Sequence, residues 1–125
     1  MKYLLIITMN PEVMGSLTEE EQNAIFAGHD AFQKEIARPG ELLSSVALAD
    51  PSNTKTVRVR DDVPAVTDGP YIEAKEFLAG YYLVECETLE RATELAAAIP
   101  DALYTAVEVR PVEFEATSSV LKTRH

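Results

Sequence analysis

The sequence contains little cysteine and no long apolar run, and both shortages exclude classes of protein. A single cysteine, Cys86, cannot form a disulfide within the chain, which agrees with a reducing compartment. The longest apolar run near the start, residues 3–7, is too short to span a bilayer and lacks the residue order of a signal peptide. We therefore expect a cytoplasmic protein that does not enter a membrane.

Positive charge is also scarce. The chain has 11 lysine and arginine residues against 21 aspartate and glutamate residues, which gives a formal net charge of −10. Such a surface repels phosphate backbones and anionic lipids, and it lacks the attraction that supplies most nucleic-acid affinity. We expect no nucleic-acid partner and no membrane partner.

Motifs for metal and nucleotide binding are missing as well. One cysteine and one histidine outside the C-terminal tail, His29, do not form a ligand set with metal-binding spacing. No glycine-rich phosphate loop follows a predicted strand. Glu85 and Glu87 flank Cys86 and disfavour its thiolate, so we interpret this cysteine as a packing residue. We predict no metal and no cofactor.

The patterns that are present predict alternating strands and helices. Thr18 and Glu21 match a capping box, which begins a helix of about five turns that ends before Pro39. Thr88 caps a second helix, which Pro100 ends. The predicted strands are residues 3–8, 41–50, 80–86 and 105–112, and a hairpin of residues 54–60 and 63–67 turns at Asp61 and Asp62.

This order predicts a single α+β domain over residues 1–125, with a polar tail from about residue 115. Without the inserted hairpin it is the ferredoxin-like βαββαβ plan, in which both helices cover one face of an antiparallel sheet. A bare second face carrying residues such as Leu5 or Tyr82 would expose more apolar surface than monomers usually tolerate. We therefore expect a homodimer, because a two-fold interface uses one patch twice.

Longer stretches carry a family resemblance. The segments TDGPYIEAKEFLAGYYLVEC, VEVRPV, MKYLLII and TVRVRD resemble the DGPF branch of the YCII-related proteins, and together they span about residues 1–112. Tyr71 and Ala79 replace a phenylalanine and a glycine of the family pattern. The resemblance implies a dimeric α+β barrel.

The resemblance also implies candidate roles, although most family members lack an assigned reaction. Relatives in the broader YCII group are described as pairing a histidine of the first helix with an aspartate as acid and base, and His29 occupies a similar position. Some DGPF proteins are encoded beside extracytoplasmic-function sigma factors, which suggests a regulatory connection.

Asp68 lies in the turn TDGPY, residues 67–71, and has two interpretations. In the structural one, its carboxylate accepts a backbone amide two residues on, Gly69 supplies the turn conformation and Pro70 stiffens it. In the functional one, the same stiff turn directs an acid into a cleft at the edge of the sheet. Both interpretations remain open from the sequence.

His29 follows Ile25 by four residues and precedes Phe32 by three, so it lies on the stripe that faces the sheet. It is either a hydrogen-bonded structural residue or a residue of a pocket. In an enzyme we expect His29 to act as base and Asp68 to orient it or to act as acid. The expected substrate-binding residues are Tyr71, Glu73, Lys75, Glu76, Tyr82 and Arg58, several of which could instead be solvated surface groups.

Two functions of different classes follow. The first is binding of a small organic molecule in a pocket near the TDGPY turn, with cofactor-free lyase or isomerase chemistry. The second is a non-enzymatic regulatory or protein-interaction module, linked to a sigma factor. Convergence of His29 and Asp68 on one cavity would favour the enzyme.

Overall fold

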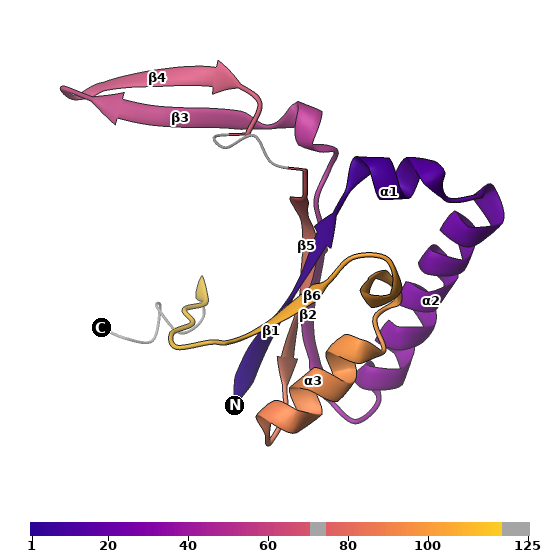
Figure 1. Cartoon of the computed structure of the whole chain (residues 1–125). Coiled ribbons are helices and arrows are strands. Elements are labelled where there is room, and N and C mark those ends of the chain that lie inside the picture. Colours follow the sequence, from indigo (N-terminus) through magenta and orange to yellow (C-terminus); the bar gives the residue numbers. More distant parts are fainter. Residues whose placement is uncertain (71–74, 119–125) are drawn as a thin grey trace, which may run out of the picture.

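Four strands form an antiparallel sheet in the order β2-β5-β1-β6 in the computed structural model, which describes residues 1–70 and 75–118 (Figure 1). The strands are β1 (Lys2–Met9), β2 (Leu42–Ala47), β5 (Phe77–Glu85) and β6 (Val107–Pro111). The helices α2 (Glu19–Ala37) and α3 (Leu89–Ala97) lie on one face of this sheet. The α+β class and the ferredoxin-like order of elements are confirmed.

Both long helices begin at the predicted caps. At the start of α2, the Glu21 backbone N–H donates to Thr18 Oγ1 at 3.1 Å, and the Thr18 N–H donates to the Glu21 carboxylate at 3.0 Å. At the start of α3, Thr88 Oγ1 accepts the Arg91 N–H at 3.1 Å. Among the described residues, no helix is long and apolar enough to cross a membrane.

Three short elements were not predicted, and each begins at a proline. They are α1 (Pro11–Ser16), η1 (Pro51–Asn53) and η2 (Pro100–Leu103). Proline suits the first position of a helix because its missing N–H would lack an intrahelical partner there in any case. The strand β5 also begins at Phe77, three residues before the predicted start at Gly80.

The core lies between the sheet and the two helices. In β1 every second side chain from Tyr3 to Ile7 is buried, as expected for a strand with one covered face. Phe32 and Ile36 of α2 and Leu95 of α3 pack against this face. The fully buried side chains with the largest volumes are those of Tyr3, Leu5, Ile99 and Val84.

The second face of the sheet carries side chains other than those expected. We expected Leu5 and Tyr82 on this second face, but both are buried beneath the helices. Apolar residues occupy both faces of these strands, so hydrophobicity alone does not show which alternate set meets the helices. The cross-strand register assigns Leu4, Ile6, Tyr81 and Leu83 to the second face, which no described helix covers (Figure 1).

The predicted hairpin is confirmed. It consists of β3 (Lys55–Arg60) and β4 (Val63–Asp68), which within the described part of the chain pair only with each other. Its two-residue turn has positive φ at both positions, 50° at Asp61 and 64° at Asp62, the mark of a primed hairpin turn. The hairpin projects from the sheet on the side away from α2 and α3 (Figure 1).

Candidate functional site

The imidazole of His29 is held between a phenol and a carboxylate. Its Nδ1 lies 2.7 Å from Oη of Tyr82 in β5, and its Nε2 lies 2.5 Å from Oδ1 of Asp101 in η2. The side chain of His29 is 21% exposed and that of Asp101 is 18% exposed. The pair is therefore partly removed from water but still within reach of a ligand.

The hydrogen-bonding capacities of these groups fix the direction of the network. An ionised Asp101 only accepts, so Nε2 of His29 carries the hydrogen and donates it. In the neutral ring Nδ1 then has a free lone pair, which accepts the hydroxyl hydrogen of Tyr82. Gln33 Nε2 donates to the same hydroxyl oxygen at 3.2 Å. With a neutral imidazole and an ionised Asp101, the hydrogen bonds therefore run in one direction, from Gln33 through Tyr82 and His29 to Asp101.

Tyr82 is positioned by packing as well as by hydrogen bonds. Its ring stacks on the imidazole of His29 at a centroid distance of 5.9 Å and meets Phe32 edge to face at 5.1 Å. Burial raises the pKa of the Tyr82 hydroxyl, against a smaller opposite effect of the hydrogen bond from Gln33. The hydroxyl therefore keeps its proton near neutral pH.

A hollow of about 270 Å³ opens beside these groups. Its lining residues with polar side chains are His29, Gln33, Ser45, Tyr81, Tyr82 and Asp101, and its other lining residues are apolar. An apolar hollow with a few converging polar groups is the usual form of a small-molecule site. The apolar walls include Ile7, Met14, Ile25, Phe26 and Val46.

Gly80 forms part of the wall where β2 and β5 lie against each other. A β-carbon at this position would lie 2.3 Å from the backbone oxygen of Val46, so no larger residue fits without displacing β2. The preceding Ala79 shows that a side chain is accommodated one position earlier. The close backbone packing therefore requires a glycine at position 80 and not at position 79.

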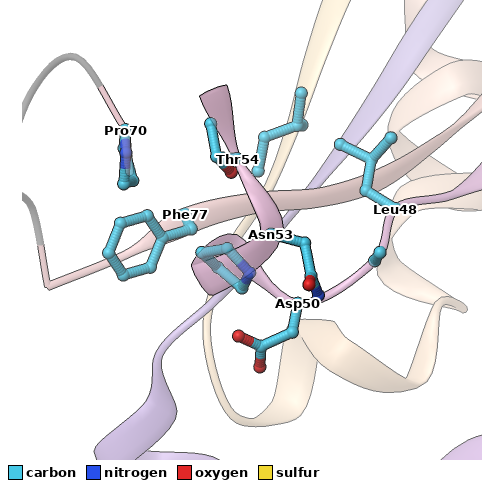
Figure 2. A pocket seen from close by; sticks show the side chains of 9 residues that line it. Leu48, Asp50, Asn53, Thr54, Pro70 and Phe77 are labelled. Atoms are coloured by element: carbon cyan, nitrogen blue, oxygen red, sulfur yellow. The ribbon is translucent and has the colours of Figure 1, made fainter. Parts of the chain in front are cut away.

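A second hollow, of about 360 Å³, lies near the TDGPY turn. Figure 2 shows Pro70 and Phe77 on one side of it and Leu48 on the other. Asp50 accepts the Ser52 N–H at 2.9 Å, and this hydrogen bond holds the pKa of its carboxyl below the usual value. Among the described residues that line this hollow there is no histidine, cysteine or lysine, so it offers no matched acid and base.

Asp68 does not meet His29 within the chain. It ends β4, its side chain is 84% exposed, and its carboxylate pairs with Lys55 across the hairpin. Gly69 has φ of +92°, which agrees with the special turn conformation expected from the sequence. The carboxylate that contacts His29 belongs to Asp101, a residue that the sequence did not single out.

The remaining predicted site residues are dispersed. Tyr82 lines the hollow beside His29, whereas Lys75 lines a separate hollow near the start of α1. Arg58 and Glu76 are exposed, and Tyr71 and Glu73 lie outside the described residues.

Cys86 lies in the core, where burial raises the pKa of its thiol. Within the described residues, no group of three or more histidine, cysteine or acidic side chains is placed to hold a metal ion. The titratable groups that line the hollow include the imidazole of His29, the phenol of Tyr82 and the carboxylate of Asp101.

Comparison with known proteins shows which family this chain belongs to. The model of the YCII-related domain matches residues 1–115, a range that includes the sheet, the helices and the hairpin. An uncharacterized protein of Rhizobium meliloti (strain 1021) is 28% identical over 114 residues, which are 90% of this chain and 92% of that protein. The chain therefore belongs to the YCII-related family.

Proposed function

We propose that the hollow beside His29 binds a small, mainly apolar organic molecule and moves a proton to or from it without a cofactor. The observation that carries this proposal is the position of His29, hydrogen-bonded to both Asp101 and Tyr82 at the wall of a mainly apolar hollow. The reaction class is that of a lyase or isomerase, since both need only proton transfers.

The proposed transfer passes through the hydroxyl of Tyr82. As a substrate proton reaches Oη, the hydroxyl proton moves to Nδ1 of His29, and the imidazole becomes an imidazolium. The carboxylate of Asp101, 2.5 Å from Nε2, stabilises the positive charge that forms. In the second half of the reaction the proton returns to another substrate atom or to a leaving group, which restores the neutral ring.

The apolar walls support this chemistry. Excluding water strengthens the electrostatic interaction between the carboxylate and the imidazolium. Positioned acid and base groups of this kind contribute roughly 10²- to 10⁴-fold to a rate. Asp68 has no part in the proposed transfer, because its exposed carboxylate pairs with Lys55 on the hairpin.

We also propose that the protein is a homodimer through the uncovered face of the sheet. Leu4, Ile6, Tyr81 and Leu83 lie together on this face and are only partly shielded in a single chain. A second copy packed against them would remove a continuous apolar surface from water.

Ligand mapping by NMR tests the proposed site. Small carbonyl compounds, acids and phenols would be screened against the ¹⁵N-labelled wild type, His29→Gln and a matched control, Asp68→Asn. We expect hits to shift amides of α2, β5 and η2, and to bind the histidine variant about tenfold or more weakly. Asp68→Asn should bind like the wild type. Hits confined to the hollow between Pro70 and Phe77 would contradict the proposal.

A further inference from the structure

The hairpin β3–β4 presents an apolar face that no described part of the chain covers. Register pairs Val57 with Val66 and Val59 with Pro64, so these four side chains share one face of the ribbon. The three valines are 59%, 62% and 65% exposed. A lone two-stranded hairpin is at best marginally stable in water, and this one also leaves its apolar face in solvent.

The position of the hairpin indicates what covers it. It projects on the side of the sheet away from the helices, which is also the side of the uncovered face (Figure 1). The ribbon and the uncovered sheet face therefore lie on the same side of the molecule. A second copy seated on the sheet face would lie within reach of the projecting ribbon.

The charge of the hairpin agrees with an acidic partner and disfavours a membrane. Residues 55–68 contain three basic and three acidic side chains and are neutral, so the rest of the chain carries the whole net charge of −10. The neutral ribbon can approach a second acidic copy without the repulsion that two acidic surfaces would suffer. Its tip consists of two aspartates, Asp61 and Asp62, which oppose insertion into a bilayer.

From these observations we infer that the hairpin is an arm that clasps a second copy of this chain through Val57, Val59, Pro64 and Val66. The inference rests on the proposed homodimer and adds a second contact surface to it. Two-fold symmetry makes the contact reciprocal, so each subunit contributes one arm and receives one. The four-stranded sheet does not include the arm, so changes to its exposed face should leave the body of the fold intact.

Sedimentation equilibrium on matched double variants tests the arm. Val57→Thr with Val66→Thr makes the apolar face polar and keeps the branched shape, whereas Val63→Thr with Ala65→Ser changes the opposite face of the same ribbon. We expect a dimeric wild type, a dissociation constant raised about tenfold or more in the first variant, and a change below about threefold in the second.

The sedimentation results distinguish a failure of the arm from a failure of the sheet-face dimer. Equal dissociation constants for the wild type and both variants would overturn the arm and leave the sheet-face dimer standing. A monomeric wild type would overturn both, without affecting the proton-transfer site, which ligand mapping tests by itself.

A second measurement needs no substitution. In dimers mixed from ¹³C-labelled and unlabelled chains, isotope-filtered NOEs detect contacts between subunits only. We expect such NOEs from the methyl groups of Val57, Val59 and Val66. Dimers in which these methyl groups show none would overturn the arm even if the variants failed to fold.

Discussion

Gly28 of α2 packs so closely on Pro100 of η2 that a β-carbon at Gly28 would lie 2.5 Å from the proline Cγ. These two residues are the chain neighbours of His29 and Asp101, which share the 2.5 Å hydrogen bond. The missing side chain of a helical glycine therefore allows the approach that brings the imidazole and the carboxylate together.

Gly28→Ala should destabilise the protein, although alanine is the better helix former by about 1 kcal/mol. The added methyl group overlaps a proline ring that has little freedom to move, and overpacking of this kind costs about 1–3 kcal/mol. Urea unfolding followed by circular dichroism measures the change. Gly15→Ala in α1 is the control, because a β-carbon there meets nothing within 4 Å. A stabilised Gly28→Ala would show that the close approach is unimportant.

Asp101→Asn should change the tautomer of His29. The wild-type carboxylate only accepts, so it holds the hydrogen on Nε2. An asparagine amide can donate to Nε2 instead, which moves the ring hydrogen to Nδ1 and removes the acceptor that faces Tyr82. Two-dimensional ¹⁵N NMR of the imidazole distinguishes the two forms. The same tautomer in both proteins would contradict the proposed direction of the network.

Tyr82 should give the protein a stability that declines in alkaline solution. Burial raises the folded-state pKa of this hydroxyl above its ordinary value of 10.0, so the folded state favours the neutral form. The contribution of this pKa difference to the free energy of unfolding is complete below pH 10 and is lost as the pH rises beyond that value. Tyr82→Phe should therefore lose less stability than the wild type between about pH 10 and 11. Parallel urea midpoints for the two proteins over this range would count against a buried, protonated Tyr82.

Glu41 should contribute to stability at neutral pH and lose that contribution in acid. Arg91 donates two hydrogen bonds of 2.9 Å to its carboxylate, and they lower the pKa of Glu41 from the ordinary value of 4.5. Because the folded-state pKa is lowered, the contribution of Glu41 to the free energy of unfolding is complete above pH 4.5 and is lost as the pH falls below that value.

Arg91→Gln should therefore flatten the acid side of the curve of stability against pH. Lys34→Gln is the control, because it removes an exposed ion pair within one helix, which contributes little. Urea midpoints measured from pH 7 down to about pH 3 would show the difference. An acid limb of equal steepness in wild type and Arg91→Gln would contradict the role of this pair.

Local chemistry made much of the fold predictable. The capping box at Thr18, the cap at Thr88 and the primed turn at Asp61 all act within four residues of the chain, so their signals are complete in the sequence. The stripe that includes His29 was also visible, because helical spacing determines which residues face the sheet.

The partner of His29 was not visible for the opposite reason. Asp101 lies 72 residues away, in a short turn that follows a proline, and nothing local distinguishes it from other acidic residues. The rigid turn around Asp68 made it a candidate acid, but a rigid turn does not determine where the carboxylate points. The close packing of Gly28 on Pro100 brings Asp101 near His29, and that contact depends on the tertiary fold.

Solvent deuterium exchange tests proton transfer in the hollow most directly. A carbonyl compound that binds beside His29 would be incubated in deuterium oxide with the wild type, His29→Gln or Asp101→Asn, and the loss of its acidic C–H signal followed by proton NMR. The wild type should accelerate exchange, and His29→Gln should slow it by about a hundredfold or more. Equal exchange rates with the wild type and His29→Gln would contradict an acid/base role for His29.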